Sequence, residues 1–295
     1  MNLISSPYSK QEPLGRLGLE GVTVRFGEVS ALDGVSIVIE PGERLAVIGA
    51  SGAGKSTLFR TLTRSVVLSS GRVTVGERNL YALSKKELKY VRRCVGTIYQ
   101  AYNLVPQLSA GVNAALGEVG SMGAWGTLRT FLIGPDPTLT SRVAAALDRV
   151  DLRDKARFRT ADLSGGQQQR VAVARLLVQQ PLLILADEPF AAVDPVTTER
   201  VMEALLELNG EGATLLVNLH DVEIARRFPR VVALREGRVV FDGSPERLTN
   251  DNLSQIYAGD PYGTVASSVD PQNHVRPHGE GPIRLMEGRD GVSSH

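Results

Sequence analysis

The stretch GASGAGKST at residues 49–57 constrains this chain more than any other part of its sequence. It fits the pattern G-x-x-x-x-G-K-[ST], whose fixed positions are here Gly49, Gly54, Lys55 and Ser56. The run RLAVIGA at 44–50 precedes it, and such apolar runs are usually strands buried on both faces of a parallel sheet. The stretch therefore predicts a phosphate-binding loop between a buried strand and a helix from Lys55 to about Leu62.

Each residue type in this loop has a physical role. Glycines let backbone N–H groups close around phosphate oxygens without a Cβ clash, and the helix N-terminus adds unpaired donors and a favourable dipole. Lys55 supplies a cation for the β- and γ-phosphates, and Ser56 supplies a hydroxyl for Mg²⁺. The remaining residues of the predicted nucleotide site are Ala50, Ser51, Gly52, Ala53 and Thr57.

A second apolar run ends in two carboxylates. LLILAD at 182–187 reads as a buried strand, and Glu188 follows it at the edge where α/β sheets bind ligands. Asp187 can hold the Mg²⁺ shell, while Glu188 points elsewhere and can orient or deprotonate a water that attacks the γ-phosphate. Alone, such a pair could simply end a strand in solvent, but a phosphate loop in the same chain favours a catalytic site.

The rest of the pattern alternates strands with helices, which predicts a mainly parallel α/β sheet. Strands are expected at 17–26, 35–40, 72–75, 95–99 and 214–220, the first two joined by a turn at Asp33-Gly34. Helices are expected at 141–150, 166–179 and 195–208, and VVALREGRVVFDG reads as a hairpin that turns at Glu236-Gly237. Residues 1–15 and 261–295 are expected to be flexible.

The composition narrows the choice of partners. A formal net charge of +1 gives no electrostatic reason to bind nucleic acid or an anionic membrane surface. The single cysteine, Cys94, excludes an internal disulfide and, with the polar start of the chain, suggests the cytosol. The longest apolar runs are too short to cross a bilayer, so any work at a membrane would need a partner.

The run LSGGQQQRVAVARLL at 163–177 places a second anion-binding helix start in the same chain, at Ser164-Gly165-Gly166. One γ-phosphate does not need two helix N-termini from one subunit, so this one is expected to serve the ATP of a neighbouring copy. With this run the chain resembles the ATP-binding-cassette (ABC) family over about residues 17–257, with its motifs in the family order.

The resemblance can be followed motif by motif. GASGAGKST resembles the Walker A loop, LSGGQ at 163–167 resembles the signature, and LLILADE resembles Walker B with Glu188 as its catalytic glutamate. AAVD, which ends at Asp194, resembles the D-loop. Gln100 resembles the Q-loop glutamine, His220 the switch histidine, and Phe26 the aromatic residue that stacks on adenine. Singly, these last three could be a surface glutamine, a helix-start histidine and a core phenylalanine.

The resemblance implies a fold and a mechanism. The fold is a P-loop NTPase of the ABC cassette type over 16–260, with a RecA-like, mainly parallel core, a small antiparallel β-subdomain and an inserted helical subdomain at about 101–164. Two cassettes would pack head to tail, with ATP between Lys55 of one copy and the signature residues Ser164, Gly165, Gly166 and Gln167 of the other. His220 would hold the γ-phosphate, and Gln100 would contact Mg²⁺ or the attacking water.

One stretch, GEVGSMGAWGTLRTFLIG at 117–134, has glycine at every third position of its first half and contains the only tryptophan, Trp125. An insert of this kind between the Q-loop and the signature resembles the phosphonate-importer ATPases. It is expected to dock on a membrane partner. The alternative is a variable loop whose tryptophan packs on its own domain.

The function implied by the resemblance is ATP hydrolysis that energises a membrane importer for phosphonates or related phosphorus oxyanions. The expected partners are two transmembrane permease subunits, a second copy of the chain and, indirectly, a periplasmic or lipoprotein solute-binding protein. The chain would then lie on the cytoplasmic face of the membrane, and no nucleic acid is expected. The alternatives are an ABC ATPase for another solute or for export, a non-transport ABC ATPase and a small-molecule kinase.

Overall fold

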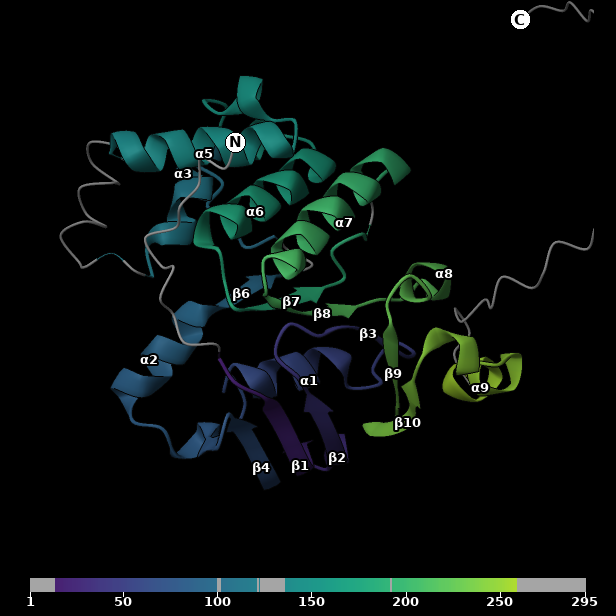
Figure 1. Ribbon diagram of the computed structural model, residues 1–295. Helices are drawn as coiled ribbons and strands as arrows, with labels where there is room; N and C mark the ends of the chain where they lie inside the picture. The colour runs from purple at the N-terminus through teal and green to yellow at the C-terminus, as the bar shows by residue number, and fades with distance from the viewer. Residues whose placement is uncertain (1–13, 100–101, 121, 123–135, 192, 259–295) are drawn as a thin grey trace, which may run out of the picture. The chain divides into compact units, whose positions relative to one another are not determined.

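The computed structural model describes residues 14–99, 102–120, 122, 136–191 and 193–258 (Figure 1). The strands are β1 Leu17–Phe26, β2 Val29–Ile39, β3 Arg44–Ile48, β4 Ser70–Val75, β5 Arg78–Asn79, β6 Val95–Ile98, β7 Leu183–Asp187, β8 Thr214–Asn218, β9 Arg230–Arg235 and β10 Arg238–Gly243. The α-helices are α1 Lys55–Leu62, α2 Lys85–Cys94, α3 Ala110–Ala115, α5 Pro137–Arg149, α6 Gly165–Gln179, α7 Pro195–Gly210, α8 Val222–Ala225 and α9 Asn250–Ile256. Short 3₁₀ turns include η2 Leu116–Glu118.

The larger sheet has six strands in the order β10-β9-β3-β8-β7-β6. Neighbouring strands from β9 to β6 run parallel, and only the edge strand β10 is antiparallel to its neighbour. The apolar runs at 44–50 and 182–187 become two of the inner strands. The mainly parallel core expected from the sequence is thus confirmed, as is the hairpin that turns at Glu236-Gly237.

The two faces of this sheet belong to two different hydrophobic cores. On β3, Ala46 and Ile48 pack into the core that contains α3, α5, α6 and α7. Leu45 and Val47 pack into the other core, which contains β1, β2 and α1. Successive side chains of a strand point to opposite faces, so a strand that is covered on both faces has to be apolar at every position. This explains the unbroken apolar runs in the sequence.

The second sheet is antiparallel, in the order β2-β1-β4-β5, and it corrects one prediction. The turn between its first two strands lies at Gly27-Glu28, not at Asp33-Gly34. Asp33 and Gly34 form an irregularity inside β2, where the pairing passes from Val24–Leu32 to Val22–Val35. Asp33 N donates to Gly237 O at 2.9 Å, so this glycine-containing pair docks on the β9–β10 turn.

The helical layer is built around α6, which packs against α3, α5 and α7 (Figure 1). The connection that follows α3 is close to α6, because a Cβ on Gly117 would lie 2.2 Å from the carbonyl oxygen of Arg175. Only glycine allows this approach. Of the glycine-rich stretch 117–134, the part from 117 to 120 and residue 122 are described, and Trp125 lies outside the described residues.

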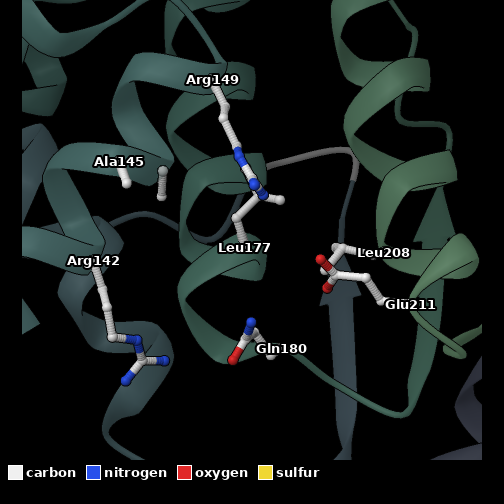
Figure 2. Close-up of a pocket in the computed structure, with 8 residues that line it drawn as sticks. Arg142, Ala145, Arg149, Leu177, Gln180, Leu208 and Glu211 are labelled. Carbon is white, nitrogen blue, oxygen red and sulfur yellow. The ribbon is translucent and has the colours of Figure 1, made fainter. Parts of the chain in front are cut away.

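Arg142 on α5 fixes this connection to the end of α6. Its Nη1 lies 2.8 Å from Glu118 Oε2, and its Nη2 donates to Val178 O at 2.5 Å. The side chains of Arg142 and Glu118 are only 15% and 13% exposed. Figure 2 shows Arg142 beside a small pocket of about 20 Å³ between α5, α6 and α7, room for about one water.

Replacing Arg142 with methionine is expected to lower the free energy of unfolding by about 2–4 kcal/mol, because the poorly solvated Glu118 carboxylate loses its cationic partner. Chemical denaturation followed by circular dichroism measures the loss. The control is Arg149→Met, on the same helix and the same pocket (Figure 2). Its pair with Glu207 is 38% and 40% exposed, so its loss should stay under about 1 kcal/mol. Equal losses in the two variants would contradict this account.

Candidate functional site

The loop between β3 and α1 has the backbone conformation that its glycines predict. Gly49 has a φ of 148° and Gly54 a φ of 104°, both in the region that residues with a side chain rarely adopt. A Cβ on Gly49 would lie 2.2 Å from Leu234 O, and a Cβ on Gly54 would lie 2.3 Å from Ala31 O. Both positions therefore require glycine, for its backbone angles and for space.

Lys55 is buried, with 5% of its surface exposed, although it carries a charge. Its ammonium group donates to two carbonyl oxygens of the loop, Gly49 O at 2.7 Å and Ala50 O at 3.0 Å. The carbonyl groups of the loop therefore surround the Lys55 ammonium group. The other predicted residues of the loop, Ser51, Gly52 and Ala53, lie on the same turn, and Ser56 and Thr57 lie in the first turn of α1.

The predicted carboxylates lie at the end of β7, next to the end of β8. Parallel pairing sets Asp187 beside Asn218, and the buried Asn218 amide donates to Asp187 Oδ1. The residue after Asp187, Glu188, has a φ of 53°, and its N–H donates to Asn218 O at 3.1 Å. The strained backbone is therefore fixed by the neighbouring strand, as residues at functional sites often are.

Glu188 and His220 are brought together by the same register. Each lies just beyond the end of its strand, and His220 Nε2 is 2.6 Å from Glu188 Oε1. Most of the Glu188 side chain is covered, whereas half of the His220 side chain is exposed. A covered carboxylate with one hydrogen-bonded imidazole is an arrangement that can position or accept a proton.

A pocket of about 360 Å³ connects three predicted residues from distant parts of the chain. Phe26, at the end of β1, Ser56 and Asp187 all line it. Phe26 is 51% exposed, so it is not a core residue, and its ring is free to contact a flat ligand. Arg60, Thr97 and Tyr99 are also part of the lining, although no motif in the sequence predicts any of the three.

The signature residues lie elsewhere. Ser164 caps α6 by accepting from Gln167 N at 3.3 Å, while Gln167 Oε1 accepts from Ser164 N at 3.0 Å. Ser164 and Gly165 are exposed, and Gly166 and Gln167 are partly exposed. None of them lines the pocket that contains Ser56 and Asp187. Within one chain, the signature and this pocket therefore have no residue in common.

Asp194 lies close to the signature. It caps α7 by accepting from Thr197 N at 3.0 Å and from Thr197 Oγ1 at 2.7 Å. These hydrogen bonds from Thr197 lower the pKa of Asp194 below its usual value. A Cβ on Gly166 would lie 3.9 Å from Asp194 Oδ2, so the capped end of α7 adjoins the start of α6. Gln100, the predicted Q-loop residue, lies outside the described residues.

Within the described parts of the chain, no helix combines the length and the apolar character needed to cross a bilayer.

One residue of the site, Asn218, was not predicted from the sequence. Its side chain holds Asp187, and its only signal in the sequence was a polar residue at the end of the apolar run TLLVN.

The parallel sheet, with a phosphate-binding loop at the end of β3 and carboxylates at the end of β7, defines a P-loop nucleotide-binding domain. The chain belongs to the ABC transporter family, whose model matches residues 32–191. The expected family and fold class are thereby confirmed.

Relatives and solved structures agree with this assignment. The chain is 44% identical to the phosphonates import ATP-binding protein PhnC of Bradyrhizobium diazoefficiens, over 82% of this chain and 89% of that protein. It is 42% identical to PhnC 1 of Rhodopseudomonas palustris, over 89% and 95% of the two chains. The cassette MJ0796, solved as a dimer in a post-hydrolysis state with ADP and Pi, has a TM-score of 0.69 and 33% identity, over 78% of this chain and 98% of its own.

Proposed function

We propose that this chain is the ATP-hydrolysing subunit of a membrane importer whose cargo is a phosphonate or a related phosphorus oxyanion. The ATPase assignment rests on the contact between His220 Nε2 and Glu188 Oε1. Glu188 directly follows Asp187 in the chain, and Asp187 lines a pocket together with Ser56. The cargo assignment is supported by the 44% identity to a phosphonate import ATP-binding protein.

In this proposal the phosphates of ATP lie in the loop 49–54 against the Lys55 ammonium, and adenine stacks on Phe26. Support comes from the buried cation inside the loop and from the half-exposed ring that lines the same pocket as Ser56. The Ser56 hydroxyl and the Asp187 carboxylate are oxygen donors, as Mg²⁺ prefers. They would hold Mg²⁺, which would neutralise charge on the phosphate oxygens, and Gln100 is proposed as a further contact of the metal or the attacking water.

Glu188 is proposed as the residue that orients the attacking water and accepts its proton. The water oxygen bonds to the γ-phosphorus as the bond from that phosphorus to the β–γ bridging oxygen breaks, and ADP leaves with phosphate. His220 positions the Glu188 carboxylate and contacts the γ-phosphate. Their 2.6 Å separation supports this division of roles.

A second copy of the chain is proposed to complete each ATP site. Ser164, Gly165, Gly166 and Gln167 are at least partly exposed and lie outside the pocket of their own chain, and Asp194 adjoins them. The similarity to the dimeric MJ0796 cassette also supports this arrangement. Two permease subunits would bind the cassettes through the helical region 101–164 at the cytoplasmic face of the membrane, and a solute-binding protein would deliver the cargo.

The test is uptake and growth on phosphorus sources. A strain that lacks this gene is expected to lose growth on methylphosphonate but not on phosphate, and a plasmid copy of the gene should restore it. A copy that carries Lys55→Met should not restore it, which ties the phenotype to the nucleotide site. Unchanged uptake of labelled methylphosphonate in the deletion strain would overturn the assigned cargo.

A further inference from the structure

Arg175, in the C-terminal half of α6, holds the chain just after β6. Its Nη1 donates to Asn103 O at 2.7 Å, and its Nη2 donates to Tyr102 O at 3.1 Å. Burial lowers the pKa of Arg175 from its usual value, but a guanidinium remains charged in proteins. One planar guanidinium here donates to two carbonyl oxygens at once, through two different nitrogens. A lysine ammonium cannot reproduce this geometry.

The backbone that Arg175 holds is strained. Tyr102 has a φ of 57° and Asn103 a φ of 47°, and two consecutive non-glycine residues in this left-handed region are uncommon. Such conformations persist only where the surroundings fix them, and they cluster at functional sites. The guanidinium contributes to fixing this pair, since it binds the carbonyl oxygens of both residues.

The held segment is continuous with the wall of the nucleotide pocket. Tyr102 N donates to Tyr99 O at 2.9 Å, and Tyr99 lines the pocket together with Ser56 and Asp187. At its other side, the Tyr102 hydroxyl lies near the start of α6, 3.5 Å from where a Cβ of Gly165 would be.

We propose that Arg175 is a positioning residue for ATP hydrolysis. It couples α6, whose first turn contains the signature, to the Tyr99 wall of the pocket, so that a displacement of α6 also displaces this wall. The inference rests on the proposed function, in which the pocket holds ATP and the start of α6 contacts the ATP of a second copy. Arg175 itself touches no substrate.

The test uses Arg175→Met in the full-length chain. The variant is expected to lower kcat for ATP hydrolysis by about tenfold or more, because the reacting groups lose their alignment. The Kd for a non-hydrolysable ATP analogue should change by less than about twofold, because the phosphate loop is untouched. Arg175→Lys should restore part of kcat, since one ammonium can still bind one of the two carbonyls.

Arg170 provides a matched control on the same helix. Its Nη1 donates to two carbonyl oxygens, Val150 O at 3.0 Å and Asp151 O at 3.1 Å, and Asp151 also has a left-handed φ, of 54°. Neither of these residues lines the nucleotide pocket. Arg170→Met therefore removes a similar clamp that does not reach the pocket lining, and its kcat should stay within about twofold of the wild type.

Two outcomes would overturn the proposal. One is a wild-type kcat in Arg175→Met, and the other is an equal loss of kcat in Arg170→Met, which would indicate a general loss of structure. Amide exchange adds a readout without nucleotide, and exchange in the segment 102–108 should rise in Arg175→Met but not in Arg170→Met. If the wild-type chain itself showed no ATP hydrolysis, the proposed function would have failed, and this result is distinct from the other two.

Discussion

Replacing Glu188 with glutamine is expected to lower kcat for ATP hydrolysis by about a thousandfold while ATP binding is retained. Glutamine has the same shape and can still accept a hydrogen bond from His220, but it cannot take a proton from water. It also removes a negative charge that would repel the γ-phosphate. We therefore expect the variant to accumulate as an ATP-bound dimer, which light scattering with and without ATP would detect.

The control for this variant is Glu223→Gln. Glu223 lies in the first turn of α8, just after His220. Its side chain is 84% exposed and has one loose contact to Arg226, at 3.6 Å. Its loss removes the same charge from the same region without touching the Glu188–His220 pair, so turnover should be unchanged. A Glu188→Gln variant that kept about a tenth or more of the wild-type rate would contradict the assignment of Glu188 as the base.

Replacing Lys55 with methionine is expected to raise the Kd for ATP by about a hundredfold, which corresponds to about 3 kcal/mol. Methionine keeps much of the aliphatic stem, so the loop retains its packing. It loses the ammonium group, which donates to Gly49 O and Ala50 O in this structure. Charge-assisted hydrogen bonds to phosphate are among the strong ones in proteins. Isothermal titration with a non-hydrolysable analogue measures the change.

Lys86→Met serves as the control, because Lys86 is exposed on α2, outside the phosphate-binding loop. Its ATP affinity should match that of the wild type. Nearly equal affinities in the two variants would place the phosphates away from the loop 49–54. The proposal would then lose its nucleotide site even though the family assignment would stand.

Features with short-range causes were predictable from the sequence. The phosphate-binding loop and the hairpin at Glu236-Gly237 depend on a few adjacent residues whose backbone preferences are strong. The inner strands were predictable because a strand covered on both faces has to be apolar throughout. The start of α6 was equally local, since Ser164 caps its own helix.

The misplaced turn has a long-range cause. Asp33-Gly34 has the composition of a turn, but a contact with Gly237, about two hundred residues away, places it inside a strand. Helix α2 was missed although its signals are local. Leu88, Val91 and Cys94 recur at helical spacing, and Ser84 and Glu87 form a capping box at its start.

Sequence motifs identified Glu188 and His220 as site residues, but they did not show that the two side chains are in contact. Their contact depends on β7 and β8 pairing in a register that sets Asp187 beside Asn218, and no local pattern specifies that register. Arg175 was invisible for a similar reason, since its partners Tyr102 and Asn103 lie more than seventy residues earlier in the chain.

The division of β3 between two cores also limits how this chain can change length during evolution. An insertion of one residue in such a strand would exchange Leu45 and Val47 with Ala46 and Ile48, and large and small side chains would then face the wrong layer on both sides. No compensating substitution in a single layer could repair both. Insertions and deletions that survive selection should therefore fall between the strands of the parallel sheet, and divergence within the strands should proceed by exchanges of similar volume.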